Sequence, residues 1–413
     1  MANREFDIVV LGATGFTGQL VVEYLANKYG VDGEVKWAIA GRNRSKLEAV
    51  RAANVPEEKR EALHIIEADS TNAASLNAMA QRTRVVCTTV GPYAKYGTPV
   101  VEACVKHGTD YCDLTGEVQW MARVISEHQA TAELSGARIV HTCGFDSIPF
   151  DMGNWFLQQC MQEQYGAFAS QVRTRVGKFS GAASGGTIAS MLNMMEEMKA
   201  DPSLRKVMAN PYALYPSDCA VGNDVGDQTG PLFDAEFDSW TAPFIMAAVN
   251  TRVVRRSNAL LGLPWGQDFR YTEGVLTSSR LKATAASAGS VVGMVTMAIG
   301  PTRKLAQRFL PKPGEGPTRE QREAGFYEVY LVGIGDSDRG HDTFVKVTGD
   351  MDPGYGSTAK MLAESALCLA KDELTVKGGF WTPASAMQGK LLTRLTQNAG
   401  LTFEQLDGPP QSV

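Results

Sequence analysis

A glycine-rich loop between an apolar strand and a helix restricts the fold of this chain more than any other feature of its sequence. The loop follows the apolar run Asp7–Leu11 and precedes the helical pattern Gln19–Tyr29. Gly12 permits a tight turn, Gly15 lets the backbone approach a pyrophosphate, and Gly18 allows the helix and strand to pack closely. The loop therefore predicts a dinucleotide-binding Rossmann domain, with the phosphates at the positive end of the helix. Its residues are Gly12, Ala13, Thr14, Gly15, Phe16, Thr17 and Gly18.

Apolar runs alternate with helical patterns over the first third of the chain. The runs are largely apolar rather than alternating, which is typical of parallel strands covered by helices on both faces. This order predicts an α/β fold with a doubly wound parallel sheet. The expected strands are Phe6–Leu11, Lys36–Ala40, Leu63–Glu67, Val85–Val90, Tyr111–Asp113 and Ala137–Thr142.

The remaining sequence predicts a second α/β domain with a mixed sheet. A chain of 413 residues is long for a single core. Phe326–Gly333 and Thr343–Gly349 alternate apolar and polar residues and predict two strands joined by a turn. Two amphipathic helices, Ser357–Lys371 and Ala384–Gln397, are expected to pack back on the first domain. We expect a cofactor domain at residues 1–150, a substrate and dimerisation domain at residues 151–355, and these C-terminal helices at residues 356–413.

Basic residues follow the second predicted strand, where an NAD-selective domain has an acid. An Asp or Glu at this place accepts hydrogen bonds from the adenosine ribose hydroxyls. Here the chain has Arg42, Arg44 and Lys46, which suit the 2′-phosphate of NADP. The alternative is a solvated basic start of a helix, although cations there oppose the helix dipole unless an anion offsets them. The predicted cofactor is therefore NADP(H).

Two turns at the carboxyl edge of the predicted sheet complete the expected cofactor site. One turn follows the third strand and is placed to contact the adenine, and the other follows the fourth strand at the nicotinamide end. These turns contain Asp69, Ser70, Val90, Gly91 and Pro92. Tyr93 and Tyr96 lie just beyond and are candidate proton donors, although tyrosines at such places are also common packing residues.

Charge and cysteine content argue against nucleic-acid and metal binding. The chain has 40 Lys and Arg against 45 Asp and Glu, a net charge of −5, and lacks the basic excess that binding a phosphate backbone requires. None of its seven cysteines forms a CxxC pair, so they are interpreted as reduced, buried thiols. The first residues lack the pattern of a signal peptide. We expect a cytoplasmic protein without metal or nucleic acid.

One uncharged stretch, Ala283–Thr302, is long enough to cross a bilayer. Its Ala, Gly, Ser and Thr residues contribute little insertion energy, so the sequence favours a buried helix or peripheral membrane contact over a span. Basic residues follow it at Arg303, Lys304, Arg308 and Lys312. The spacing of Gly289 and Gly293 permits close helix packing, in a dimer as well as in a bilayer. We expect a homodimer, with membrane contact through residues 283–302 as a further hypothesis.

A second basic segment, Asn250–Asn258, is interpreted as a strand. Alternate residues of a strand share a face, so Arg252 and Arg256 are hypothesised to receive a phosphopantetheine arm or an acidic carrier protein together, with Arg255 pointing away. A solvated strand edge is the alternative interpretation.

Four segments together resemble the saccharopine dehydrogenase-like oxidoreductases. They are the Gly12–Gly18 loop, the Gly91–Tyr93 turn, Asp110–Glu117 and Cys143–Asp151. Within that family, the chain is most similar to the bacterial branch that includes the mycobacterial trans-acting enoyl reductases. The resemblance covers nearly the whole chain and implies NADPH-dependent reduction of an enoyl group in an acyl or polyketide-type lipid, delivered free or on a carrier.

The site residues expected for this chemistry are Tyr93, Asp146 and Tyr111. Tyr93 is the expected donor to the oxyanion that develops on the thioester, and Asp146 or Tyr111 would orient the groups. The segments Phe179–Ile188 and Trp240–Val249 are small and apolar, which suits an acyl chain better than an amino-acid adduct. Reduction of an imine or carbonyl on an amino-acid-like substrate remains an alternative, as does a non-catalytic, membrane-associated NADP-binding protein.

Overall fold

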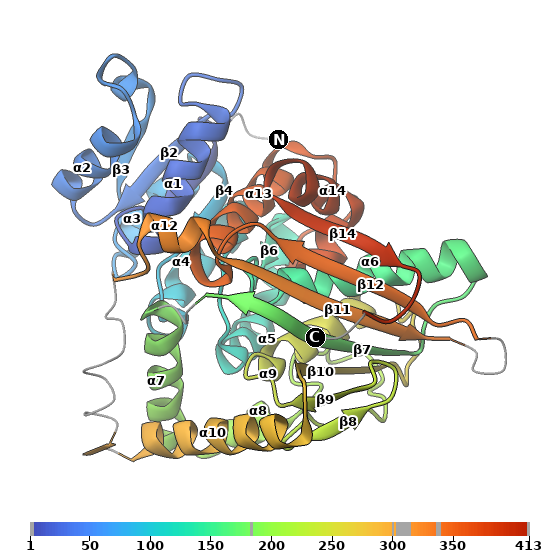
Figure 1. The fold of residues 1–413 in the computed structure, drawn as a ribbon. Helices are drawn as coiled ribbons and strands as arrows, with labels where there is room; N and C mark the ends of the chain where they lie inside the picture. Colours follow the sequence, from blue (N-terminus) through green and yellow to red (C-terminus); the bar gives the residue numbers. More distant parts are fainter. Residues whose placement is uncertain (1–3, 182–184, 300, 303–314, 336–339, 411–413) are drawn as a thin grey trace.

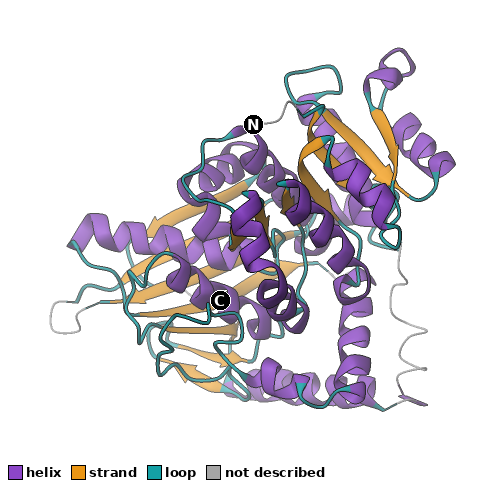
Figure 2. Cartoon of the chain, turned by 180° about the vertical axis from the view of Figure 1, so that it is seen from behind, coloured by secondary structure: helices purple, strands orange, loops and turns teal. Residues whose placement is uncertain are grey.

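The computed structural model describes residues 4–410, except 182–184, 300, 303–314 and 336–339. The chain forms two sheets that lie side by side, each of seven described strands (Figure 1). Six strands of the first sheet come from the N-terminal third and one comes from near the C-terminus. The second sheet lies beneath the first and to its right in the figure. A 180° turn shows that helices cover the rear face of the second sheet (Figure 2).

The first sheet is parallel throughout, in the order β13-β6-β5-β4-β1-β2-β3. β1 is central and fully buried, and its alternate residues face two different cores. Ile8 and Val10 belong to one core and Val9 and Leu11 to the other, which explains why the strand is continuously apolar from Ile8 to Leu11. The strands are β1 (Phe6–Leu11), β2 (Trp37–Gly41), β3 (His64–Glu67), β4 (Thr83–Thr88), β5 (Asp110–Cys112), β6 (Arg138–Val140) and β13 (Gly379–Trp381).

Helices pack on both faces of this sheet, as the sequence predicts for a doubly wound fold. α3, α4 and α5 lie against one another on one face, and α1 contacts α2 and the C-terminal helix α13 on the other. The helices of this region are α1 (Phe16–Tyr29), α2 (Arg44–Asn54), α3 (Ala73–Ala80), α4 (Tyr93–His107) and α5 (Val118–Ser135), with a 3-10 helix at Glu57–Ala62.

The second sheet is mixed, in the order β14-β12-β11-β7-β10-β9-β8. Only the β10–β7 pair of this sheet is parallel among the described strands. β11 and β12 form the antiparallel pair that the alternation of apolar and polar residues predicts. The alternation arises because every second residue of β12 is buried on the side of the sheet that α6 covers. The strands are β7 (Gln171–Ser180), β8 (Leu232–Asp234), β9 (Ser239–Ala242), β10 (Arg270–Thr277), β11 (Phe326–Ile334), β12 (Thr343–Gly349) and β14 (Leu401–Leu406).

The helices of this second region form its rear layer and one outer edge. α6 and α9 pack against the sheet, α10 contacts β8, β9 and β10 at one end of it, and α7 contacts α8 at the side of the molecule (Figure 1). The helices are α6 (Ile148–Tyr165), α7 (Gly185–Ala200), α8 (Leu204–Ala209), α9 (Ala247–Leu260), α10 (Arg280–Ala298), α12 (Arg319–Glu323), α13 (Thr358–Lys371) and α14 (Pro383–Asn398), with a π-helical turn at Pro353–Ser357.

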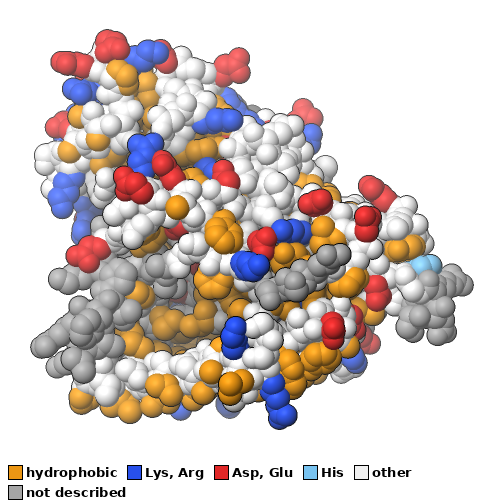
Figure 3. Space-filling view, in the orientation of Figure 1, with side chains coloured by type: hydrophobic (Ala, Val, Ile, Leu, Met, Phe, Trp, Pro, Cys, Tyr) orange, Lys and Arg blue, Asp and Glu red, His pale blue; other side chains and the backbone are white. Residues whose placement is uncertain are grey.

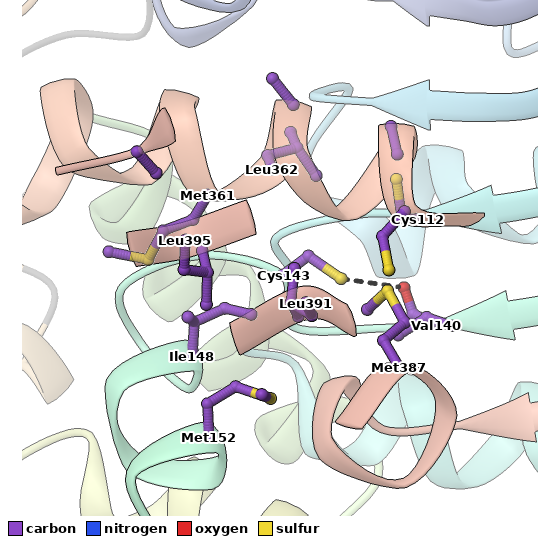
Figure 4. Close-up of a cluster of buried hydrophobic side chains, with 14 of the residues drawn as sticks. Cys112, Val140, Cys143, Ile148, Met152, Met361, Leu362, Met387, Leu391 and Leu395 are labelled. Atoms are coloured by element: carbon purple, nitrogen blue, oxygen red, sulfur yellow. Dashed lines mark hydrogen bonds between the residues drawn. The ribbon is translucent and has the colours of Figure 1, made fainter. Parts of the chain in front are cut away.

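The predicted return of the C-terminal helices to the first sheet is confirmed for α13, whereas α14 packs on α13, α6, α9 and β14. α13 contacts β1, β4 and β5, and Met361 and Leu362 of α13 lie close to Leu391 of α14 in a shared core (Figure 4). Cys143 in the same core directs its thiol toward the carbonyl oxygen of Val140 at 3.7 Å. The chain does not end in helices, however, because β14 joins the second sheet. The domain boundaries at residues 150 and 355 stay a prediction.

The strand predicted for Asn250–Asn258 is wrong; of the alternatives for Ala283–Thr302, the buried helix is wrong, whereas peripheral membrane contact stays a prediction. Asn250–Asn258 is part of helix α9 and not a strand, and Arg252, Arg255 and Arg256 are buried, so they form no basic surface. The helix predicted in Ala283–Thr302 exists, but Ala283 and Ser287 are its only buried side chains among those described. The basic residues from Arg303 to Lys312 lie outside the described residues. Within the described ranges, no helix combines the length and apolarity that crossing a bilayer demands.

Candidate functional site

The glycine loop adopts the conformation that close phosphate approach requires. Gly12 has a φ of +90°, and a Cβ atom there would lie 2.8 Å from the Oγ1 of Thr89. A Cβ on Gly18 would lie 2.1 Å from the carbonyl oxygen of Gly12, so only glycine lets α1 come this close to the loop. The backbone N–H of Gly15 donates to the carbonyl of Gly12 at 2.9 Å and closes the turn.

The N-terminus of α1 has the properties of a phosphate site. Gly15 is its N-cap, no side chain caps the helix, and its first turn contains no acid. The helix dipole and the N–H groups of the first turn are therefore available to bind an anion, because no protein carboxylate competes for them. The residues present fit the pyrophosphate of a dinucleotide.

The predicted 2′-phosphate site lies at the ends of β2 and β3. The Arg42 side chain is exposed and makes no hydrogen bond or ion pair with the residues that the structure describes. Arg44 is already engaged by Glu48 at 3.1 Å and Glu67 at 3.4 Å. The structure thus leaves Arg42 as the more available guanidinium, which an anion can approach from solvent. Lys46 is exposed on the first turn of α2.

Asp69 and Ser70 follow β3, beside this basic end. The Asp69 carboxylate accepts hydrogen bonds from the backbone N–H of Thr71 at 2.9 Å and from its hydroxyl at 2.8 Å. These hydrogen bonds, with a smaller contribution from the charge of Arg42, lower the pKa of Asp69. Ser70 is buried. Asp69 therefore forms a rigid, charged turn at the predicted adenine end.

A cavity of about 480 Å³ begins at the glycine loop and extends toward the second sheet. Phe16 and Thr17 of α1, and Gly91 and Pro92 of the turn after β4, line its first end. The structure thus brings together two predicted cofactor segments that lie far apart in the sequence. Figure 3 shows a hollow lined by hydrophobic side chains on this face of the molecule.

The far wall of the cavity is apolar and comes from the second region. Sequence reasoning anticipated small apolar residues from Trp240–Val249, and four of them line the cavity. It did not assign the methionines of α7 to the site, because period and composition do not show which groove a helix covers. The apolar wall consists of Ala189, Met191, Met194, Met208, Ile245, Met246, Ala248 and Val249. Residues 182–184 of the other expected segment, Phe179–Ile188, lie outside the described residues.

The structure separates the predicted catalytic tyrosines from the cavity interior. Tyr93 borders the cavity, but its hydroxyl is buried, where it donates to the carbonyl of Thr88 at 3.2 Å and accepts from the N–H of Leu114. Tyr111 does not line the cavity, and its hydroxyl donates to Asp113 at 2.8 Å. Burial raises the pKa of both phenols far above the ordinary value. Neither hydroxyl is placed to give a proton to a substrate.

Tyr96 and Asp146 lie where the predicted chemistry needs polar groups. Both line the cavity, and neither side chain hydrogen-bonds to another described residue. Burial raises the pKa of Asp146 to about 6, so a fraction of this carboxyl group carries a proton near neutral pH. Tyr96 follows Tyr93 by one helical turn of α4, which explains why sequence spacing alone does not distinguish the two.

Glu117 is a cavity residue that sequence reasoning did not assign. Its carboxylate accepts from the N–H of Tyr93 at 2.7 Å, the N–H of Ala94 at 2.9 Å and the hydroxyl of Ser190 at 2.7 Å. It therefore caps α4 from outside that helix and joins it to α7. Burial raises the pKa of Glu117, although these hydrogen bonds oppose the shift. The sequence did contain a signal for this residue, because Glu117 is an acid that directly follows Gly116 in the loop after β5.

Comparisons with known proteins agree with this site. The saccharopine dehydrogenase NADP-binding domain matches residues 8–140, which confirms the predicted NADP(H) cofactor. The chain is 40% identical over 416 residues to a Mycobacterium tuberculosis protein assigned to the trans-acting enoyl reductases, with 97% of each chain covered. It is 38% identical over 423 residues to the trans-acting enoyl reductase of Mycobacterium ulcerans, with 96% of this chain and 97% of that protein covered.

A solved structure shares the fold at low identity. The apo saccharopine dehydrogenase (L-Glu forming) from Saccharomyces cerevisiae matches 97% of this chain and 99% of its own, with a TM-score of 0.53 and 13% identity. This likeness extends over both sheets and confirms the predicted fold class. At such low identity it shows the fold alone.

Proposed function

The chain belongs to the same family as the trans-acting enoyl reductases, and we propose that it uses NADPH to reduce the carbon–carbon double bond of an enoyl thioester on an acyl chain. The observation that carries this proposal is the cavity: one end borders the dinucleotide loop and the other is an apolar wall. An acyl chain matches such a wall, whereas an amino-acid adduct needs paired charges.

The chemistry divides between cofactor and protein. Bound NADPH supplies a hydride for the β-carbon of the enoyl group, and becomes NADP⁺. The thioester oxygen gains negative charge as the double bond is lost, and the Tyr96 hydroxyl is the free donor that can stabilise it. The α-carbon then needs one proton, which Asp146 gives in its neutral form. The saturated thioester leaves, and solvent returns the proton to Asp146.

The remaining cavity residues position and enclose the substrate. Glu117 holds the N–H groups of Tyr93 and Ala94, and thereby fixes the first turn of α4 on which Tyr96 lies. The methionine side chains of α7 exclude water from the reacting carbons and adapt to acyl chains of different shape. Tyr93 has a structural role in this proposal, because its buried hydroxyl donates to the carbonyl of Thr88. Tyr111 has no direct role, because it does not line the cavity.

A substrate panel tests the proposal. Purified protein is mixed with NADPH and a short series of enoyl thioesters, imines and ketones, and the loss of NADPH absorbance is followed. Oxidation with the enoyl thioesters alone is the expected result. Oxidation only with the imine or carbonyl compounds would establish the alternative reductase. Tight NADPH binding without turnover of any compound would favour the non-catalytic alternative.

The surface of α10 supports a homodimer as a further part of this proposal. Val292, Met294 and Val295 are each more than half exposed, and a Cβ at Gly289 or Gly293 would meet no atom within 4 Å. Small residues four apart let a second helix approach closely. Sedimentation of the wild type as a dimer, and of Gly293→Leu as a monomer, is expected. A monomeric wild type that floats with liposomes would favour peripheral membrane contact through residues 283–302 instead.

The cysteine side chains support a reducing, cytoplasmic location. All seven are free, and all except Cys219 are buried. Proteins of oxidising compartments more often use cysteines as disulfides. Fractionation of cells that express the protein, with NADPH-dependent activity recovered in the cytosolic fraction, is the expected result.

A further inference from the structure

Helix α9 has three buried arginines, and only two of them have an acidic partner. Arg252 forms an ion pair with Asp227, and Arg255 forms one with Asp224 at 2.6 Å. Arg256 is 3% exposed, yet no carboxylate among the described residues lies within ion-pair distance of it. A buried charge without a counter-ion is unusual, because removing it from water is costly.

Backbone carbonyls satisfy only part of the Arg256 side chain. One terminal nitrogen donates to the carbonyl of Leu214, and the other donates to the carbonyl of Phe380 at 2.8 Å. A guanidinium has five N–H donors, so three remain without a partner in the described structure. Burial lowers the pKa of Arg256 to about 10, as expected for a buried cation without a counter-charge.

A second cavity, of about 730 Å³, lies beside this guanidinium. α5, the end of α9, the segment from Ala213 to Cys219 and β13 form its walls. It shares no lining residue with the cavity proposed for catalysis. Ile125 and Trp381 supply apolar and aromatic surface, whereas Ser126 and Ser217 supply exposed hydroxyls.

We propose that this second cavity binds a small molecule through a single carboxylate that pairs with Arg256. A planar guanidinium matches a carboxylate, and its unpaired N–H groups provide the donors for it. Two acids, Glu133 and Asp218, also line the cavity and are exposed. They repel a ligand with several negative charges, so a monocarboxylate with an apolar or aromatic body fits better than a diphosphate.

Calorimetric titration with benzoate and acetate tests the proposal. The matched probes are sodium chloride and inorganic phosphate at the same ionic strength. Saturable binding of benzoate, tighter than acetate and absent with chloride, is expected for the wild type. Arg256→Gln should weaken benzoate binding at least tenfold, and Arg256→Lys should weaken it less. Phosphate binding without carboxylate binding, or no saturable binding of either carboxylate, would overturn the proposal.

A second pair of variants does not depend on changing a buried residue. Ser126 lies on α5 at the cavity and is exposed, so Ser126→Glu adds a competing carboxylate to the wall of the cavity that Arg256 also lines, while Ser126→Gln adds the same bulk without charge. Benzoate affinity should fall at least tenfold more in Ser126→Glu than in Ser126→Gln. NADPH affinity should remain unchanged in both variants and serves as the control for folding. Equal benzoate affinity in the two variants would contradict pairing with Arg256.

Discussion

The hydroxyl of Ser190 donates a hydrogen bond to the carboxylate of Glu117 at 2.7 Å, and this contact joins α7 to the first turn of α4. The same carboxylate already holds the N–H groups of Tyr93 and Ala94. One side chain therefore links the wall of the proposed acyl site to the turn beside the proposed nicotinamide site. The position of α7 and the geometry of that turn should change together when this link is altered.

Removing the Ser190 hydroxyl should loosen α7. Ser190→Ala leaves the two backbone donors of Glu117 in place but deletes its contact with α7. A net loss of ~1 kcal/mol corresponds to roughly fivefold faster local opening. Hydrogen exchange of the α7 amides measures it, with Ser203→Ala as the control, because Ser203 contacts only Asp201 by its hydroxyl. Unchanged exchange in α7 would show that its other contacts hold it.

Arg42 should determine the preference for NADPH over NADH. Arg42→Ala removes the available guanidinium at the end of β2 and should weaken NADPH binding by about one to two orders of magnitude, since a charge-assisted hydrogen bond contributes about 1.5–3 kcal/mol. NADH binding should hardly change. Fluorescence titration of both cofactors measures this. Arg44→Ala serves as the comparison, because its loss of NADPH affinity should be smaller and should be screened by salt. Equal losses for both cofactors would make Arg42 structural.

Tyr96 and Tyr93 should respond differently to loss of their hydroxyl groups. Tyr96→Phe removes the proposed oxyanion donor and should lower kcat by about a hundredfold with a smaller effect on KM. Tyr93→Phe removes a buried hydrogen bond to the Thr88 carbonyl, and should cost about 1 kcal/mol of unfolding free energy with little change in kcat. Steady-state kinetics and urea unfolding separate the two effects. The reverse pattern would return the catalytic role to Tyr93.

Asp146 should give the activity an acidic pH dependence. The neutral carboxyl group is the proton donor, so kcat should fall as pH rises through the Asp146 pKa of about 6. Asp146→Asn should lower kcat by at least about a hundredfold and remove this pH dependence. A pH profile of single-turnover rates measures both. A variant that keeps the wild-type profile would exclude Asp146 as the acid.

The same substitution should stabilise the folded protein at higher pH. The pKa of Asp146 rises from 3.8 to about 6 on folding, so folding favours the neutral form, and stability is lost as pH rises between these values. Above pH ~6, Asp146→Asn should therefore raise the unfolding free energy by up to about 3 kcal/mol. Urea unfolding at acidic and alkaline pH measures the difference. No gain above the pKa would show that water or a ligand compensates the ionised carboxylate.

The sequence predicted the first sheet well because its signals are local. The glycine loop, the apolar strands and their alternation with helices all concern neighbouring residues, and β1 and β2 lie where the pattern indicates. The cofactor end of the site follows from the same pattern, since loops at the carboxyl ends of parallel strands meet at one edge. Position in a motif was sufficient to identify these segments.

Side-chain direction and distant partners were not predictable in this way. Tyr93 and Tyr96 are one helical turn apart, and only the packing of α4 shows which hydroxyl is buried. The arginines of α9 looked like a surface because their partners Asp224 and Asp227 lie in an irregular segment well before the helix. Conversely, the buried alternative for α10 was wrong because apolar composition does not show whether another element covers a helix.

The last two strands divide between the two sheets: β13 adds an edge to the first, and β14 adds an edge to the second. During synthesis the ribosome has to release β13 before the first sheet reaches its final width, and β14 before the second sheet does. Until then, β6 and β12 present open edges to which strands of other nascent chains can pair. Translation of this chain thus includes an interval in which chaperone protection is most valuable, and it ends when the segment after α14 leaves the exit tunnel.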